Sequence, residues 1–265
     1  MKGFNLKLKK LLTRKYLNIV AYLIFTIYML KLITSSDSWT TKGVYISILL
    51  FFGFFAVLYE VLNILYNKAI KNLTEYCDPY EGQRLISYVQ KYDIFKSFRS
   101  SVCVFSLLSL RDMGKPVEII NLLNSEKSKV FSNSHELLLI YHYSLFFAYG
   151  ELGDTIKAKE HYNKLMELKD KKSNIKKINQ LFSWNGINGY YKYLNKNFSE
   201  SRRFYNKVIT NTMNNREKIN FYMLLARLEY AERNKAESKR LFTYIIENGN
   251  KMAVKNEANE TILRL

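Results

Sequence analysis

The feature that most constrains this chain is a pair of long apolar runs near its N-terminus. Residues 16–33 read YLNIVAYLIFTIYMLKLI, with Lys31 as the only charge. Residues 44–66 read VYISILLFFGFFAVLYEVLNILY, with Glu60 as the only charge. A helix rises about 1.5 Å per residue, so roughly 20 residues cross a hydrocarbon core of about 30 Å. The two runs therefore predict two transmembrane helices joined by a short connector.

A secretory signal peptide is the alternative interpretation of the first run, because a basic start before an apolar stretch is common to both. The run is long for a signal peptide, and no small-residue cleavage site precedes the second run. We therefore expect an uncleaved anchor.

The distribution of cations predicts the orientation of the hairpin. The first fifteen residues carry six Lys or Arg and no acid, and Lys68 and Lys71 follow the second run closely. Cations concentrate on the cytoplasmic side of a membrane, so both termini should lie inside. We expect an integral protein of a bacterial plasma membrane. Its organisation should be a basic cytoplasmic N-terminus, a transmembrane hairpin and a cytoplasmic domain, at residues 1–15, 16–66 and 67–265.

Glu60 is an acid inside the second predicted span. An ionisable group in a membrane suggests a function, such as proton coupling or pairing with another subunit. Glu60 also lies within about two helical turns of the expected inner interface, where it can reach Lys68 or lipid headgroups. We favour the interfacial interpretation, because a two-span hairpin offers no obvious transport pathway.

The remainder of the chain has the composition of a helical domain. The whole chain contains only 2 Pro and 10 Gly, which leaves few of the marks that separate strands and tight turns. Asn197 and Glu200 have the spacing with which a helix cap and an acid three residues later satisfy each other's backbone donors. About ten helices are expected, separated by short polar breaks, so they should pack as antiparallel neighbours. The sequence therefore predicts an all-α fold.

Similar segments recur along this domain. They begin at Gly114, Gly153, Lys196 and Arg233, so the spacings are 39, 43 and 37 residues. In the last three segments a small residue precedes an aromatic residue by four positions. The pairs are Ala158 and Tyr162, Ser201 and Tyr205, and Ser238 and Phe242.

This layout resembles the tetratricopeptide repeats, whose second helix carries a small residue four positions before an aromatic one. The resemblance covers about residues 96–248, with Phe146 at a position where a small residue is usual and with spacings above the family's usual length of about 34. It implies an α-solenoid of helix pairs. A terminal helix at 251–264 should cap the apolar end of such a stack.

The resemblance also implies a concave wall formed by the first helix of each pair. Aromatic side chains beside an arginine suit a peptide or a partner helix laid along such a wall. The alternative is that these aromatic stripes belong to the core, because helical spacing alone does not separate the two cases. The implied wall residues are Tyr143, Phe147, Tyr190, Tyr193, Met223, Arg227 and Tyr230.

Motifs for catalysis or for metal binding are missing from the sequence. There is no GxxxxGK[ST] or GxSxG, and no second histidine follows His135-Glu136 at position 139, where a zinc-protease helix requires one. Cys77 and Cys103 are interpreted as reduced thiols. We therefore expect no enzyme activity and no cofactor.

The whole chain carries a formal charge of +18, and several basic runs lie in the helical domain. The default for such an exposed helical face is simple solvation. Attraction to anionic lipid headgroups, worth about 1 kcal/mol per cation near the membrane, is a sharper interpretation, and an acidic partner protein would serve as well. Nucleic acid is the weaker candidate because no nucleic-acid-binding fold signature is present. The runs are Lys169 to Lys172, Lys176-Lys177, Arg202-Arg203 and Lys239-Arg240.

The leading hypothesis is a membrane-anchored, non-enzymatic adaptor whose repeat domain binds a cytoplasmic protein or peptide. A peptide-sensing regulatory or immunity-type membrane protein would use the same wall. An accessory subunit of a larger membrane complex would act through the hairpin and Glu60 instead. The sequence leaves the oligomeric state open.

Overall fold

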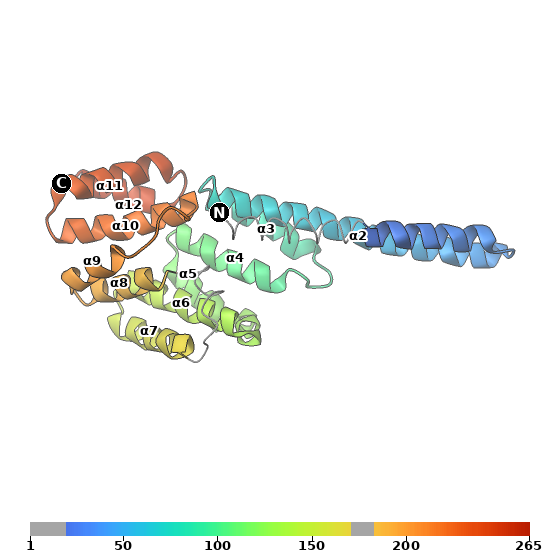
Figure 1. Cartoon of the computed structure of the whole chain (residues 1–265), viewed down its shortest axis with the longest axis horizontal. Coiled ribbons are helices and arrows are strands. Elements are labelled where there is room, and N and C mark those ends of the chain that lie inside the picture. Colours follow the sequence, from blue (N-terminus) through green and yellow to red (C-terminus); the bar gives the residue numbers. More distant parts are fainter. Residues whose placement is uncertain (1–19, 171–182) are drawn as a thin grey trace. The chain divides into compact units, whose positions relative to one another are not determined.

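The computed structural model describes residues 20–170 and 183–265, and every regular element within those ranges is a helix (Figure 1). The all-α class is therefore confirmed for the described residues. The predicted basic segment 1–15 and the first four residues of the first predicted span lie outside them. The chain divides into two compact units, the apolar unit Met1–Ile64 and the repeat unit Leu65–Leu265.

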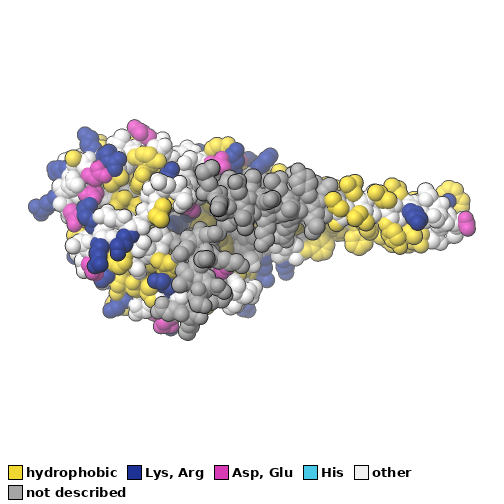
Figure 2. Space-filling view, viewed as in Figure 1, with side chains coloured by type: hydrophobic (Ala, Val, Ile, Leu, Met, Phe, Trp, Pro, Cys, Tyr) yellow, Lys and Arg dark blue, Asp and Glu magenta, His cyan; other side chains and the backbone are white. Residues whose placement is uncertain are grey.

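The described part of the apolar unit consists of a helix over Val20–Ser35 and the first part of α2 (Trp39–Thr74). Phe25 of the first helix packs edge-on against Phe52 of α2, with ring centroids 5.7 Å apart. Most other apolar side chains of this unit are exposed, and they cover its visible face in the space-filling view (Figure 2). Exposed apolar surface on this scale is typical of a segment that contacts lipid or a partner.

Within the described ranges, α2 is the one helix long and apolar enough to cross a membrane, while Val20–Ser35 is a shorter apolar helix. The second predicted span was expected at 44–66, but α2 starts five residues earlier and ends eight residues later. The difference arises because hydropathy marks the part of a helix that suits lipid and not the ends of the helix. The polar residues on either side contain no proline, so the helical hydrogen bonds continue through them.

The C-terminal part of α2 belongs to the repeat unit, where Ala69 and Leu73 are fully buried. It is followed by α3 (Pro79–Tyr92) and α4 (Arg99–Asp112), which pack against each other. Gly82 makes this packing possible, since a Cβ there would lie 2.8 Å from Cζ of Phe105 and 3.4 Å from the carbonyl oxygen of Ala69. Asp78 begins α3 by accepting a hydrogen bond from the amide of Glu81 at 3.0 Å.

The remaining helices form adjacent pairs, as expected for a helical repeat. Helix α6 packs against α7, α8 against α9, and α10 against α11, while α5 packs against α6 and α12 against α11. Their bounds are α5 Pro116–Asn124, a 3₁₀ helix Glu126–Asn133, α6 His135–Glu151, α7 Thr155–Asp170, α8 Trp184–Leu194, α9 Phe198–Tyr205, α10 Asn215–Ala231, α11 Lys235–Asn248 and α12 Ala253–Ile262.

The turns between paired helices repeat in backbone conformation. Gly114, Gly153, Lys196 and Arg233 all have positive φ, at 69°, 76°, 58° and 63°. These positions are the starts of the four segments recognised in the sequence. The left-handed residue ends one helix, as is common at helix C-termini. In the last three turns the next residue is Asp or Asn, and its side chain accepts a hydrogen bond from an amide of the following helix.

In two of the pairs, a serine of the second helix donates an equivalent hydrogen bond to a backbone carbonyl of the first helix. Ser201 Oγ donates to the carbonyl oxygen of Gly189 at 2.9 Å, and Ser238 Oγ donates to that of Ala226 at 3.3 Å. The two bonds span the same sequence separation of twelve residues, so the register of the pair is conserved between the two segments. In the pair α6–α7 the corresponding residue on α6 is Phe146, which is fully buried opposite Ala158.

The two ends of the repeat unit contact each other. Arg216 of α10 forms a buried ion pair with Asp112 of α4, and Asn220 Nδ2 donates to the same carboxylate at 3.1 Å. Near the end of α11, Lys251 Nζ lies 2.6 Å from Asp78 Oδ2, and Asn250 Nδ2 donates to the carbonyl oxygen of Tyr76 at 2.7 Å. The expected terminal helix is present as α12. The array nevertheless closes on itself, which an open stack with a capped end does not do.

Candidate functional site

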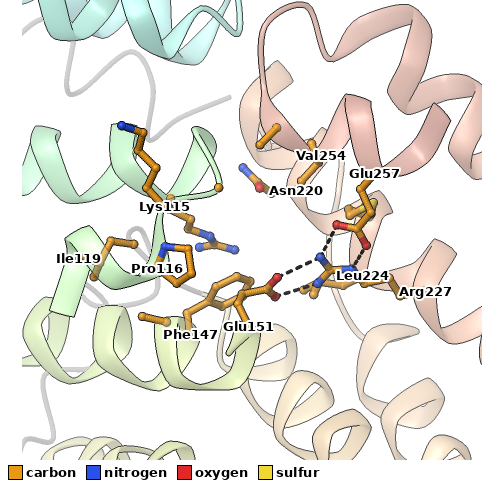
Figure 3. Close-up of a pocket in the computed structure, with 15 residues that line it drawn as sticks. Lys115, Pro116, Ile119, Phe147, Glu151, Asn220, Leu224, Arg227, Val254 and Glu257 are labelled. Atoms are coloured by element: carbon orange, nitrogen blue, oxygen red, sulfur yellow. Dashed lines mark hydrogen bonds and ion pairs between the residues drawn. The ribbon is translucent and has the colours of Figure 1, made fainter. Parts of the chain in front are cut away.

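The closure of the repeat unit leaves a cavity of about 310 Å³ among α4, α5, α6, α10 and α12. Apolar side chains, among them Phe147, Leu224 and Val254, form part of its wall (Figure 3). Charged side chains from four of the five helices also reach it. Small ligands bind in concave sites of about this size, where apolar side chains and converging polar groups meet.

Arg227 of α10 is the centre of the charged part of the wall (Figure 3). Its Nη1 and Nη2 bond to Glu151 at 2.7 and 3.0 Å, and its Nε and Nη2 bond to Glu257 at 2.6 Å each. The guanidinium therefore joins α6 to α12 through α10. Paired contacts of this kind are the strongest form of protein ion pair, and four bonds leave the Arg227 fork little capacity for another anion.

Tyr190 of α8 extends this network, since its hydroxyl donates to Glu151 Oε1 at 2.9 Å. The ring approaches α6 closely because Gly150 has no side chain. A Cβ at this position would lie 2.7 Å from the Tyr190 hydroxyl oxygen. Gly150 and Glu151 thus act together, one by leaving room for the ring and the other by accepting its hydrogen bond.

Burial and the paired charges shift the pKa values of Glu151 and Arg227 in opposite directions. Burial alone would raise the pKa of Glu151, but Arg227 and the Tyr190 hydroxyl hold that pKa below its usual value. Burial would lower the pKa of Arg227, yet the two carboxylates hold it above its usual value. The pKa of Tyr190 is raised well above its usual value, first by burial and then by Glu151. Glu151 and Arg227 are therefore both charged at neutral pH, with Tyr190 as a neutral donor.

Aromatic rings continue the wall beyond these charges. Phe147 stacks on Tyr190 with centroids 4.6 Å apart, and Tyr190 is nearly parallel to Tyr193 at 6.5 Å. On the other face of this group, the guanidinium carbon of Arg111 lies 3.6 Å from the centroid of Phe147. Arg111 Nη1 also donates to the hydroxyl of Tyr143 at 2.5 Å.

Six of the seven predicted wall residues lie in or beside this site. Phe147, Met223 and Arg227 line the cavity, Tyr143, Tyr190 and Tyr193 adjoin it through the contacts above, and Tyr230 is exposed and outside the lining. Tyr190 and Met223 are buried, each 2% exposed. The implied concave wall is therefore partly core, as the alternative interpretation had it.

Sequence reasoning missed Arg111, Glu151 and Glu257. The repeat register would have found Arg111, because it precedes Gly114 by three residues as Tyr193 precedes Lys196. Glu151 lies four residues after Phe147 on the same helix face, which is a weaker signal. No pattern pointed to Glu257, since α12 lies after the last repeat.

Other residues singled out in the sequence lie elsewhere. Glu60 is on α2 in the apolar unit, and Cys77 and Cys103 are buried thiols that are not in a disulfide. His142 and His161 face each other across the α6–α7 pair, with their Nδ1 atoms 3.1 Å apart. Across residues 20–170 and 183–265, no three His, Cys, Asp or Glu side chains are grouped to hold a metal ion.

Several cations of the basic runs are already paired. Arg202 bonds to Glu229 and Glu232, and Arg240 bonds to Glu237 at 2.6 Å. Residues 171–172 and 176–177 of the other runs lie outside the described ranges. Surface charge is therefore partly neutralised on α9 and α11.

Comparisons of the chain with protein-family models, with curated proteins and with solved structures found no match.

Proposed function

We propose that this protein is a membrane-anchored, non-enzymatic adaptor whose tetratricopeptide-like repeat unit binds a peptide or protein segment in the cytoplasm. In this proposal Val20–Ser35 and α2 both belong to spans that cross the membrane, and both termini lie inside. The cation distribution of the sequence and the exposed apolar side chains of the apolar unit support the anchoring part.

The observation that carries the binding part is that α6 and α10 bring an aromatic ring and an arginine to the wall of one cavity, and aromatic rings of α8 pack behind that wall. Phe147 comes from α6, Tyr190 and Tyr193 come from α8, and Arg227 comes from α10. Aromatic residues and arginine dominate the binding energy of protein interfaces, because they combine large contact areas with directed polar groups. An extended peptide end suits a cavity that combines apolar side chains with charged groups.

Photocrosslinking in living cells tests this proposal directly. A benzophenone amino acid would replace Tyr143 or Tyr193, which are partly buried beside the cavity, and Tyr88 of α3 as an exposed control. We expect adducts with the same protein or peptide from positions 143 and 193 and none of that species from position 88. Identical adducts from all three positions would contradict the proposal.

The accessory-subunit alternative is favoured by one observation, the acid Glu60 within the apolar helix α2. Replacing residues 16–66 by an unrelated two-span hairpin separates it from the adaptor. The adaptor keeps its adducts at positions 143 and 193 after this exchange. Loss of those adducts in a protein that is still inserted in the membrane would favour the subunit in a larger complex.

A further inference from the structure

The cavity contains an arginine that forms no ion pair with an acid of the described residues. In the part of the repeat unit that the structure describes, Arg202, Arg216 and Arg227 each pair with one or two acids, but no ion pair joins Arg111 to an acid. Arg111 instead contacts the rings of Phe147 and Tyr143 and donates to the Tyr143 hydroxyl. Arg111 Nε is buried and has no hydrogen-bond partner.

An arginine donor without an acceptor is costly in a partly buried site, because its hydration is lost and is not replaced. The guanidinium is held in place on one side by stacking on Phe147 at 3.6 Å. Arg111 also lines the cavity, so a ligand there can reach it. The position is therefore a preorganised donor with unused capacity.

The neighbouring charges limit what can bind to Arg111. Lys115 also lines the cavity, but its Nζ is 2.7 Å from Glu118, and Arg227 is saturated by Glu151 and Glu257. These pairs leave Arg111 as the one basic side chain among the described lining residues that is outside an ion pair, so an entering carboxylate finds its partner there. A doubly charged phosphate would be repelled by Glu151 and Glu257.

The apolar lining residues indicate the chemistry of the uncharged part of the ligand. Ile119, Leu224 and Val254 line the cavity and favour an aliphatic group. The volume of about 310 Å³ equals roughly ten waters at about 30 Å³ each, which accommodates one aliphatic residue and its carboxylate.

We propose that this cavity binds a carboxylate attached to an aliphatic group, with Arg111 as the residue that holds the carboxylate. In the form that deepens the proposed adaptor function, and rests on it, the ligand is the C-terminal residue of a peptide. The carboxylate accepts hydrogen bonds from the Arg111 guanidinium, and the aliphatic group packs on the apolar wall. A free aliphatic acid has the same chemistry.

Calorimetric titration of the full-length chain in nanodiscs tests this assignment. The probes are acetyl-Ala-Ala-Leu with a free C-terminal carboxylate, the same peptide as its C-terminal amide, and 4-methylpentanoate. We expect the free-carboxylate peptide to bind at least tenfold more tightly than its amide. The Arg111→Met variant should lose that preference, while Arg203→Met, at an exposed position on α9, should keep it.

A second variant covers the case in which Arg111→Met does not fold. Val254→Phe on α12 fills the cavity from a partly exposed position, so it should abolish binding of the acid peptide with Arg111 intact. Unchanged affinity in Val254→Phe would overturn the assignment of the ligand to this cavity.

The probes separate this inference from the adaptor function. Equal affinity of the acid and amide peptides would overturn the carboxylate site and leave peptide binding in place. If 4-methylpentanoate bound as tightly as the acid peptide, the carboxylate site would stand and the peptide ligand would fail. If none of the probes bound, the carboxylate site would be refuted, while photocrosslinking at positions 143 and 193 would still judge the adaptor function.

Discussion

At the scale of single residues, the histidine pair between α6 and α7 links stability to pH. Burial, and then the neighbouring His161, lowers the pKa of His142 to about 4. The pKa of His161 is lowered as well, mainly by burial. A histidine with a lowered pKa binds its proton more readily in the unfolded chain, so its stabilising contribution is full above the unfolded value of about 6.5.

We therefore expect the free energy of unfolding to fall as the pH drops from about 6.5 to about 4. Because both rings are only half-buried, the loss should be on the order of 1 kcal/mol after solvent screening. Denaturant unfolding of the repeat unit at several pH values measures it. His142→Asn should flatten the slope over this range, and an unchanged slope would show that the pair does not contribute.

The left-handed turn residues give a second expectation at this scale. Lys196 and Arg233 adopt φ of 58° and 63°, where a Cβ is disfavoured and glycine is not. Lys196→Gly should raise the free energy of unfolding by about 1 kcal/mol, because the equivalent turns already use Gly114 and Gly153. Glycine at the exposed helical position Lys239 of α11 serves as the control and should lower it by about 1 kcal/mol. Equal effects at the two positions would contradict this account of the turn.

Much of this residue-level detail could be predicted. The recurring Gly-Asp and Lys-Asn turns indicated where helices end and begin, because a left-handed residue and a capping side chain are local properties of the chain. The partners of Arg227 could not be predicted, since these carboxylates lie 76 and 30 residues away along the chain. Local chemistry predicts a cap but not which distant carboxylate meets a guanidinium.

At the scale of helix pairs, packing between α8 and α9 depends on one glycine. A Cβ at Gly189 would lie 2.3 Å from Cε1 of Tyr205, whose ring is buried. Gly189→Ala should destabilise the repeat unit by about 1–3 kcal/mol, the usual cost of overpacking, as measured by thermal or denaturant unfolding.

Gly186 on the same helix is the matched control for this substitution. Its Cβ would lie 3.5 Å from the Ser183 Cβ, an ordinary contact. Gly186→Ala should therefore be neutral or should stabilise by up to about 1 kcal/mol, since alanine favours helix. Equal destabilisation by both substitutions would mean that helix propensity, and not contact with Tyr205, controls the pair.

The helix pairs themselves were predictable from the sequence, but the limits of α2 were not. The small residues Ser201 and Ser238 marked the contact positions of two pairs because close helix packing requires them. The length of α2 depends on polar flanks that neither favour nor break a helix. Its last turns are fixed by tertiary packing of Ala69 and Leu73, which hydropathy does not register.

At the scale of the whole repeat unit, closure depends on the buried pair between Asp112 and Arg216. Asp112→Asn removes the countercharge and leaves Arg216 buried without a carboxylate partner. Such a loss typically costs about 3–5 kcal/mol. We expect hydrogen exchange to accelerate in both α4 and α10, which lie 104 residues apart at this pair.

The exposed pair Glu237 and Arg240 on α11 provides the contrast. Glu237→Gln should change stability by less than about 0.5 kcal/mol, because exposed pairs contribute little. A similar small effect for Asp112→Asn would mean that the two ends of the unit are held by other contacts.

Closure is the part of the fold that sequence reasoning could least supply. The repeats predicted a stack, and a stack with the same pairs can remain open or close. The choice depends on the small rotation between successive pairs and on contacts such as Lys251 with Asp78, which are 173 residues apart. No periodicity within the chain reports such a contact.

An open repeat array can gain or lose a helix pair during evolution, because each pair contacts only its neighbours. In this protein the first and last elements are joined, so the removal of one helix pair would separate Asp112 from Arg216, and an added pair would displace them. Closure of the ring thus fixes the number of helix pairs. Variation in this protein should appear as substitutions within the ring and not as changes in its copy number.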